Sequence, residues 1–365
     1  MRQLANQIPE IPCKTWGFWT KKRPNHELCR WMVEGRPALE PLVAQLPELL
    51  PSFGLPGTDF TWKELPSFDD RNLLVSVEGR KYVLKAHNTL LPSGSHGRLQ
   101  AQDRLIQHLQ KQALPVPDVL ENLGAPSHVR VLSYLEGEVL KTEAPKSLPF
   151  LQSVGKWVAK VATSLQTYED EAMNWTWDWD MKRLPEVVRT KLSFMSDQRR
   201  LLAARLCEEY AAHLTPEVVA QLPHSVLHAD LNDTNLLFAG EEIVGIIDFG
   251  DSIYSCRIFE PAITAGYFSL GQANPLQVLR EVLRGYLQQV PWDLSNEEVM
   301  AYFHAARGRV LLSVAFAAEN SFLEPDNEYL AHTAEPGWRV LEALEDTEKA
   351  LPELLDVASA VRSER

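Results

Sequence analysis

Cysteine is scarce in this sequence, and the few cysteines lie far apart. The chain of 365 residues contains four, at Cys13, Cys29, Cys207 and Cys256. Structural zinc sites and disulfide frameworks need cysteines at short or paired spacings, so the sequence indicates neither. Buried or incidental thiols in a reducing compartment are the remaining interpretation, and we expect a cytoplasmic protein.

Long apolar runs, internal repeats and an excess of basic residues are also missing. No stretch approaches the length of a membrane span, and no apolar run follows the early charges. The formal net charge of −13 disfavours nucleic acid and anionic membranes as partners, because both attract basic surfaces. An acidic chain is compatible with a small cationic substrate. The sequence makes no prediction about the oligomeric state.

The composition is that of a globular protein, with 45% hydrophobic and 23% charged residues. The length allows two packed lobes. Residues 1–36 are rich in Trp, Lys, Arg and Pro and show no period, so we interpret them as an N-terminal extension. Residues 37–137 are predicted to form a β-rich first lobe and residues 138–365 a mainly helical second lobe. The predicted fold class is α+β.

Hydrophobic periodicity predicts the elements of each lobe. In the first lobe we expect helices over residues 38–50 and 97–112. Strands are expected over residues 60–65, 73–77, 82–85, 116–119 and 129–135. In the second lobe helices are expected over residues 151–165, 192–213, 275–289, 297–320 and 337–360. The cluster Trp175, Trp177 and Trp179 is typical of a core, with a substrate wall as the alternative.

Two polar motifs interrupt apolar strands of the second lobe. Residues 228–235 read HADLNDTN, and residues 246–251 read IIDFGD. Transfer of a γ-phosphoryl group requires a base near the acceptor hydroxyl and hard oxygen ligands for magnesium. Asp230 is therefore predicted as the base, and Asn235 and Asp248 as the magnesium ligands. The order and spacing of these residues indicate phosphoryl transfer to a small molecule.

Lys85 closes a predicted strand of the first lobe, where a lysine can reach the α- and β-phosphates of a nucleotide. In kinases the following helix holds this lysine with a glutamate. Gln100 and Asp103 are both available here, and the sequence does not decide between them. His228, in the first motif, is predicted to brace its loop by hydrogen bonding.

Two other functions are compatible with parts of the pattern. His224, His228 and Asp230 could hold zinc or iron for hydrolysis, because imidazole and carboxylate groups bind these metals. That interpretation leaves Asn235 and Asp248 without a role. The second alternative is a catalytically silent nucleotide-binding module, which the intact motifs disfavour.

The two motifs resemble those of the aminoglycoside phosphotransferase and choline kinase family, and within it the hydroxylysine kinases. Four more segments are similar to that branch: LPSFDDRN at residues 65–72, YVLK at residues 82–85, FEPAIT at residues 259–264, and residues 329–338. The similarity runs from about residue 38 to about residue 345, so the extension lies outside it.

This resemblance implies a protein-kinase-like fold and phosphorylation of the hydroxyl of 5-hydroxy-L-lysine. GTP is the implied donor in this branch, ATP in the wider family, with magnesium as cofactor. Ala229 stands where the family usually has glycine, and Gln100 where it commonly has the lysine-pairing glutamate. The family roles fall on residues predicted above: Asp230 as base, Asn235 and Asp248 as metal ligands, and Lys85 as phosphate ligand.

A glycine-rich loop before Lys85 is missing, which distinguishes the chain from protein kinases. Residues 67–72 fill the hairpin turn instead. Main-chain amides and the side chains of Ser67 or Asn72 are therefore expected to cover the phosphates. The lack of an arginine directly before Asp230 points the same way.

Hydroxylysine carries two ammonium groups and a carboxylate, so its site should pair acids with the amines and a guanidinium with the carboxylate. Asp251 is the candidate for an amine. Arg309 is the candidate for the carboxylate, with a structural ion pair as the alternative. Glu260 is expected to anchor the helix that follows it. Other acceptors to be considered are homoserine, choline and aminoglycosides.

Overall fold

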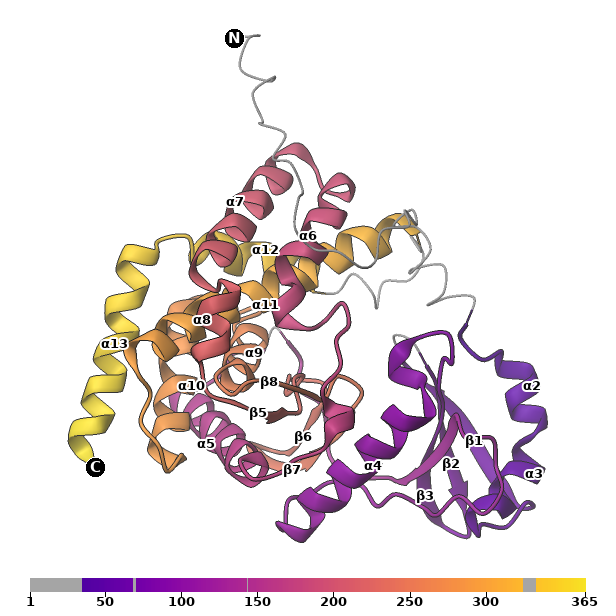
Figure 1. Ribbon diagram of the computed structural model, residues 1–365. Helices are drawn as coiled ribbons and strands as arrows, with labels where there is room; N and C mark the ends of the chain where they lie inside the picture. Colours follow the sequence, from indigo (N-terminus) through magenta and orange to yellow (C-terminus); the bar gives the residue numbers. More distant parts are fainter. Residues whose placement is uncertain (1–34, 68–69, 143, 324–332) are drawn as a thin grey trace.

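The chain forms two lobes that lie side by side (Figure 1). The computed structural model describes residues 35–67, 70–142, 144–323 and 333–365. The extension predicted over residues 1–36 therefore lies almost entirely outside the described residues.

The first lobe is built on an antiparallel sheet of four strands in the order β1-β2-β3-β4. These are β1 (Phe60–Leu65), β2 (Arg71–Val77), β3 (Arg80–Ala86) and β4 (Val129–Ser133). Two short helices, α2 (Leu39–Ala44) and α3 (Leu46–Leu49), pack on one face of the sheet. Helix α4 (His96–Lys111) lies between the sheet and the second lobe (Figure 1).

The alternation of side chains along β2 makes one face of the sheet apolar and the other polar. Leu73, Val75 and Val77 are buried against the apolar residues of α2 and α3. Asn72 points to the other face, where it lies opposite Lys85 of β3. The sheet therefore turns one apolar face to its own core and one polar face toward the second lobe.

The strand predicted over residues 116–119 is not formed. Val119 makes only an isolated bridge with Leu132. Pro115 and Pro117 carry no amide hydrogen, so this segment cannot donate a regular ladder of hydrogen bonds.

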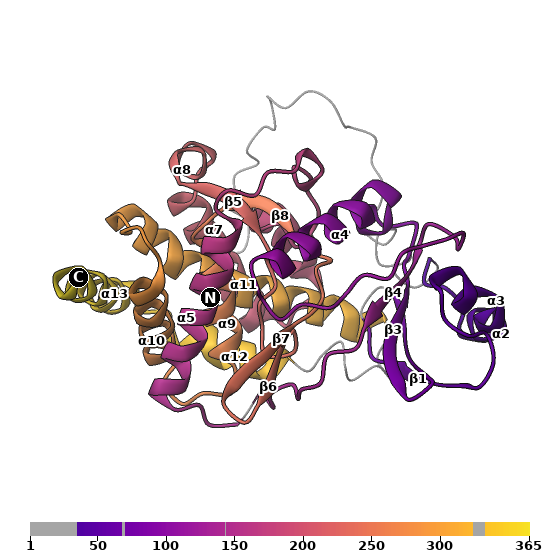
Figure 2. The ribbon, with the colours of Figure 1, turned by 90° about the horizontal axis from the view of Figure 1, so that it is seen from below.

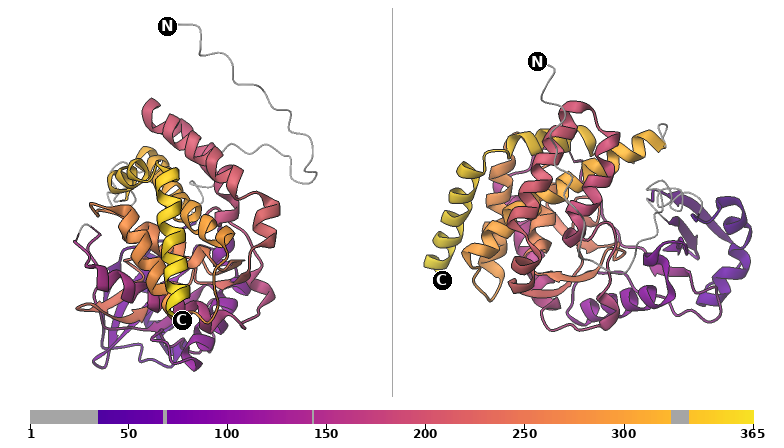
Figure 3. Two further views of the ribbon diagram at one scale, coloured as in Figure 1. Left: turned by 90° about the vertical axis from the view of Figure 1, so that its left-hand side faces the viewer. Right: turned by 45° about the horizontal axis from the view of Figure 1, so that its top comes forward.

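The second lobe is mainly helical, as expected, and Figures 2 and 3 show its helices gathered on one side of the molecule. Two small antiparallel sheets carry the motifs: β5 (His224–Leu227) pairs with β8 (Ile253–Cys256), and β6 (Leu236–Ala239) pairs with β7 (Glu242–Ile246). The helices are α5 (Leu148–Leu165), α6 (Leu184–Lys191), α7 (Asp197–His213), α8 (Pro216–Gln221), α9 (Phe259–Phe268), α10 (Pro275–Gln289), α11 (Asn296–Leu323), α12 (Ala334–Ala343) and α13 (Thr347–Glu364).

One predicted helix begins later than expected, and another is divided. The helix predicted over residues 192–213 begins at Asp197, because residues 192–194 form a separate 3₁₀ turn and Met195 and Ser196 are extended. The helix predicted over residues 337–360 is divided between α12 and α13 by residues 344–346.

Helix α11 positions the site from the middle of the second lobe. It packs against α9, α12 and α7, and most of its residues are buried. Buried arginines, including Arg309, interrupt its apolar surface. Within the described part of the chain, no helix combines the length and the apolar character needed to cross a membrane.

Candidate active site

The loop between β5 and β6 is held by His228, which is fully buried. Its Nε2 donates to the carbonyl oxygen of Ile247 at 3.0 Å, and its Nδ1 accepts the amide of Asp230 at 3.3 Å. These bonds assign the neutral tautomer, and burial lowers the pKa of His228 to about 4. The hydrogen-bonded bracing predicted for His228 is therefore present, and it joins the two motifs.

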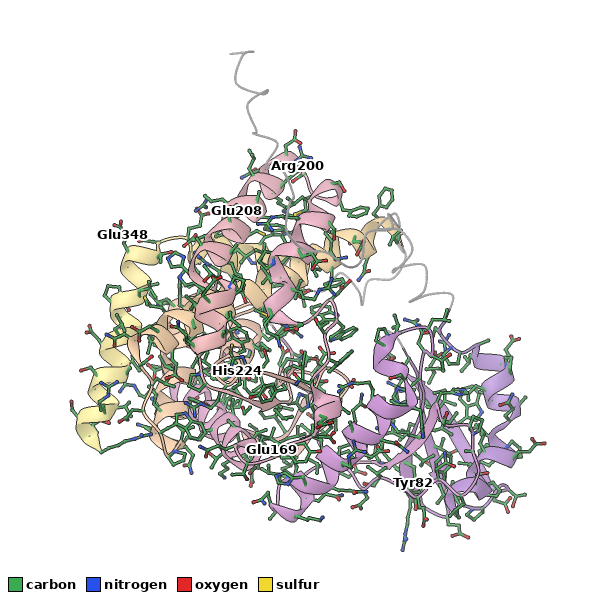
Figure 4. All side chains as sticks on the ribbon, in the orientation of Figure 1. Tyr82, Glu169, Arg200, Glu208, His224 and Glu348 are labelled. Atoms are coloured by element: carbon green, nitrogen blue, oxygen red, sulfur yellow. The ribbon has the colours of Figure 1, made fainter. Side chains whose placement is uncertain are left out.

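The hydrolytic alternative does not fit this geometry. Both ring nitrogens of His228 make hydrogen bonds to the backbone, so neither is left for a metal ion. His224 lies on β5 (Figure 4), with Nδ1 2.7 Å from the carbonyl oxygen of Leu222. Across the described ranges, no three His, Cys, Asp or Glu side chains form a group that could hold a metal.

Glu260 corrects a prediction. It lies in the first turn of α9 and is fully buried, but its carboxylate does not serve that helix. It accepts the amides of His228 at 2.6 Å and Ala229 at 3.0 Å. Burial raises the pKa of Glu260 to about 7, against the effect of the two amide donors. Glu260 therefore anchors the loop between β5 and β6 from α9.

Each motif contains one residue in the left-handed backbone region. Ala229 has φ of 66° and Asp248 has φ of 62°. This backbone region favours glycine. The positive φ therefore explains why the family that the sequence resembles usually has glycine at the position of Ala229. The small side chain of alanine is accommodated at the same turn. At Asp248 the residue with the unusual backbone conformation also carries the carboxylate of the motif, and such conformations are common at functional sites.

Asp230 faces the cavity with both carboxylate oxygens held. Nδ2 of Asn235 donates to Oδ2 at 2.7 Å and to the Asp230 carbonyl oxygen at 3.0 Å. Nη2 of Arg309 donates to Oδ1 at 2.8 Å. Burial raises the pKa of Asp230, and the positive charge of Arg309 opposes that shift. The arrangement yields a fixed, ionisable carboxylate with a raised pKa, which suits a proton acceptor.

Asp248 and Lys85 join the two lobes at the other side of the cavity. Their Oδ1 and Nζ atoms are 3.2 Å apart, although the residues are 163 positions apart in sequence. The ammonium group lowers the pKa of Asp248. The strand-terminal lysine and the second motif, predicted separately, are thus brought together.

The donor set beside Asp248 fits a magnesium ion. Asn235 uses its Nδ2 group for Asp230, and none of the hydrogen bonds within the described residues engages its Oδ1. The same holds for Oδ2 of Asp248, since only Oδ1 meets Lys85 and the amide of Gly250. A carboxylate and an amide oxygen are hard ligands of the kind magnesium prefers, with water and phosphate oxygens completing its shell.

A cavity of about 660 Å³ between the lobes collects most of the predicted site residues. Ser67 lines it from the β1–β2 turn, where its hydroxyl accepts the amide of Asp70 at 3.2 Å. His228 and Glu260 support the loop from behind. The predicted residues that line the cavity are Ser67, Asn72, Lys85, Asp230, Asn235, Asp248, Asp251 and Arg309.

Gln100 corrects another prediction. It lies on the exposed side of α4 and does not line the cavity. Gln102 is the residue of α4 that lines it, and its side-chain oxygen accepts Nη2 of Arg130 at 2.9 Å. Asp103, the other residue considered, binds Nη1 of Arg130 at 2.6 Å. Helix α4 therefore holds neither residue against Lys85.

Arg309 contacts several groups of the protein, although its Nε has no hydrogen-bond partner among the described residues. Besides Asp230, its Nη2 lies 3.4 Å from Oδ2 of Asp251, and its Nη1 donates to the carbonyl oxygen of Trp179 at 3.2 Å. Its guanidinium lies 4.6 Å from the ring centre of Trp179 and 5.4 Å from that of Tyr267. The geometry favours the structural ion pair, which was the alternative to binding a substrate carboxylate.

Sequence reasoning left several cavity residues unassigned. Trp177 and Trp179 line the cavity, which favours the substrate-wall alternative for part of the tryptophan cluster. Their position between two predicted helices of the second lobe was the available signal. Asp70 and His87 also line it. Asp70 lies within the LPSFDDRN segment, whereas no motif marks His87.

Comparison with known proteins agrees with this geometry. The family model described as "Phosphotransferase enzyme family" matches residues 61–303. The hydroxylysine kinase of Mus musculus is 29% identical over 342 residues, which cover 82% of this chain and 89% of that protein. The homoserine kinase of Zymomonas mobilis is 23% identical and covers 67% of this chain and 75% of that protein.

Solved structures confirm the predicted fold. A microcompartment-associated aminopropanol kinase superposes with a TM-score of 0.66 at 15% identity, covering 84% of this chain and 99% of that one. At this identity the likeness concerns the fold, which is the protein-kinase-like arrangement of two lobes. Since the family model matches more than half of the chain, the protein belongs to the phosphotransferase enzyme family and is a small-molecule kinase.

Proposed function

We propose that the protein transfers the γ-phosphoryl group of GTP or ATP to the side-chain hydroxyl of 5-hydroxy-L-lysine. The observation that carries the reaction is one cavity with Asp230 on one side and the Lys85–Asp248 pair on the other. The similarity to hydroxylysine kinases over 82% of the chain supports the acceptor.

Asp230 is the proposed base. Its carboxylate accepts the proton of the acceptor hydroxyl while the new bond to the γ-phosphorus forms and the bond to the β–γ bridging oxygen breaks. Asn235 and Arg309 hold the carboxylate in one orientation, which reduces the entropy that must be lost in the transition state. The raised pKa of Asp230 makes it a better proton acceptor than an exposed aspartate.

Lys85, Asn235 and Asp248 are the proposed nucleotide end of the site. Lys85 provides a mobile positive charge for the phosphates, and Ser67 and Asn72 approach them from the sheet. Asn235 and Asp248 would hold magnesium, which supplies charge neutralisation for the transferred group. The proposed donor is GTP, with ATP as the alternative.

The acceptor end is proposed to recognise ammonium groups. Asp251 lines the cavity, and Trp177, Trp179 and Tyr267 supply aromatic walls. Carboxylates and ring faces both attract cations when water is excluded. Arg309 balances the charges of Asp230 and Asp251, so we assign it to the protein's own acids instead of to the substrate carboxylate.

Homoserine is the second candidate acceptor, because homoserine kinases are among the relatives. It lacks the side-chain ammonium of hydroxylysine. Choline and aminoglycosides are the other candidate acceptors. A catalytically silent nucleotide-binding module is the alternative to an enzyme.

A coupled phosphorylation assay tests the proposal across these acceptors, with GTP and ATP compared at equal concentrations. We expect the highest kcat/KM with hydroxylysine. Equal activity on unrelated alcohols, or none on hydroxylysine, would overturn the acceptor. Nucleotide binding without turnover on any of them would favour the silent module.

A further inference from the structure

Lys85 needs an anionic partner that helix α4 does not supply. Gln100 is exposed, and Asp103 is paired with Arg130 at 2.6 Å. Asp248 meets Lys85 at 3.2 Å, but the proposed function assigns Asp248 to the metal ion. A carboxylate that binds a divalent cation has less charge to offer a lysine, so a further partner is required to hold Lys85 on the phosphates.

The sheet brings four polar residues to one face. Asn72 of β2 lies directly opposite Lys85 of β3, and Arg71 lies opposite Ala86. Asp70 directly precedes β2, and continuing the alternation of that strand by one residue places it on the same face as Asn72, diagonally across from Lys85. Asp70 contacts His87, two residues after Lys85 and again on this face. Asp70, Asn72, Lys85 and His87 all line the cavity.

Asp70 is held in a fixed orientation. Its Oδ2 accepts Nδ1 of His87 at 2.7 Å, and its Oδ1 accepts the amide of Asn88 at 3.0 Å. On the far side of the ring, Nε of Arg130 donates to Nε2 of His87 at 3.1 Å. Arg130 is fixed in turn by Gln102 and Asp103 of α4. The chain of contacts therefore runs from α4 through the imidazole to the carboxylate.

The charges along this chain leave Asp70 as an anion. Nε2 of His87 accepts a hydrogen bond, so the ring is the neutral tautomer with its proton on Nδ1. Burial also lowers the pKa of His87. Burial opposes ionisation of Asp70, but the hydrogen bonds from His87 and Asn88 and the nearby Lys85 ammonium hold its pKa low. Its negative charge is thus not cancelled by an imidazolium.

We propose that Asp70 is the positioning residue for Lys85, in the role that a helix glutamate has in other kinases. Asn72 supports it, because its Oδ1 is buried in the cavity wall without a hydrogen-bond partner within the described residues. Lys85 then has an acceptor opposite it and a carboxylate diagonal to it. The inference rests on the proposed nucleotide site but not on the identity of the acceptor.

Calorimetric titration of the full chain with the magnesium complexes of ATP and GTP tests this inference. Asp70→Asn keeps the shape and one of the two accepting oxygens but removes the charge. We expect its Kd for the preferred nucleotide to rise about tenfold, the scale of one charge-assisted contact. Glu64→Gln is the matched control, since it removes a carboxylate paired with Arg71 on the same hairpin but outside the cavity. Its Kd should not change.

A double variant separates charge from structural support. Asp70→Asn combined with Asn72→Asp moves the carboxylate to the position opposite Lys85, and we expect it to recover most of the lost affinity. A purely structural role for Asp70 predicts no recovery, and that result would overturn the inference. If Asp70→Asn does not fold, Asp70→Glu and Asp70→Gln are compared instead, and equal affinities contradict a role for the charge.

The outcomes also distinguish this inference from the proposed function. A wild-type chain that binds neither nucleotide contradicts both. A wild-type chain that binds, with an Asp70→Asn variant that binds equally well, contradicts only the role of Asp70.

Discussion

Asp230 is the residue on which the proposed chemistry depends, and its surroundings restrict it from three sides. Asn235 and Arg309 hold its two oxygens, and the amide of Asp230 is bound to His228. A carboxylate held in this way is available for a proton without rearrangement. His228 and Asn235 belong to the same loop, whereas Arg309 comes from α11, 79 positions away in sequence.

Replacing Asp230 by asparagine tests the base directly. The amide oxygen can still accept Nη2 of Arg309, and Asn235 can still donate to the carbonyl oxygen of residue 230, but the bond from Asn235 to Oδ2 is lost and no proton can be taken up. We expect kcat to fall by about three orders of magnitude, within the range for general bases. The Kd for nucleotide, measured by calorimetry, should stay the same. Turnover close to that of the wild type would refute the assignment.

The pH profile of kcat/KM tests the electrostatics of the same group. The base acts in its ionised form, so activity should be lost as the pH falls through the raised pKa of Asp230. Arg309 lowers that pKa. Arg309→Met should therefore move the acid limb to higher pH, whereas Arg309→Lys, which keeps the charge, should leave it close to that of the wild type. An acid limb at the same pH in all three proteins contradicts the coupling.

The sequence contained enough to find the polar residues of the motifs but not all of their partners. Asp230, Asn235 and Asp248 follow from spacing alone. Glu260 was predicted to serve its own helix because an acid in a first turn usually does, but its contacts lie 31 and 32 positions away. The prediction that Gln100 faces the nucleotide was wrong. The resemblance to the family did not show which residues of the helix face the cavity.

At the scale of elements, hydrophobic patterns predicted most boundaries of helices and strands. They failed where single residues interrupt the regular backbone. Helix α10 spans the predicted residues 275–289 because Asn274 caps it and an apolar stripe runs along it. The predicted helix over 192–213 and the predicted strand over 116–119 failed at Ser196 and at prolines. The first failure concerns where a helix begins, which is the least certain part of an element. The second concerns a strand that does not form, because its prolines cannot donate hydrogen bonds.

Helices α5 and α10 approach closely through glycines, and this contact can be tested. A Cβ atom at Gly285 would lie 2.0 Å from the carbonyl oxygen of Gln152, and one at Gly155 would lie 2.2 Å from that of Val282. Gly285→Ala should lower the free energy of unfolding by about 2 kcal/mol, because the clash outweighs the roughly 1 kcal/mol gain in helix propensity. Urea denaturation measures the change.

Gly97 in α4 is the matched control for that substitution. A Cβ atom there would have nothing within 4 Å. Gly97→Ala should therefore stabilise the protein, by up to about 1 kcal/mol. Destabilisation by Gly97→Ala, or stabilisation by Gly285→Ala, would contradict the packing argument.

At the scale of the whole molecule, several contacts join the lobes, and two of them lie next to the cavity. Lys85 reaches Asp248 across the cavity. Arg98 of α4 donates to the carbonyl oxygen of Ser252 at 2.6 Å and stacks on the ring of Trp175 at 3.9 Å. Arg98 therefore fixes α4 to the segment that follows Asp251. Neither contact has a local pattern, so the sequence predicted two lobes but not how they meet.

The most direct test of the whole account compares two amino acids that differ by one hydroxyl group. The full chain is incubated with magnesium, with GTP or ATP, and with either 5-hydroxy-L-lysine or L-lysine. Release of nucleoside diphosphate is measured, and the phosphorylated product is identified by mass spectrometry. We predict rapid release and a phosphate on the side-chain oxygen with hydroxylysine, and only background release with lysine. Equal release with both amino acids, or no phosphorylated hydroxylysine, would contradict the account.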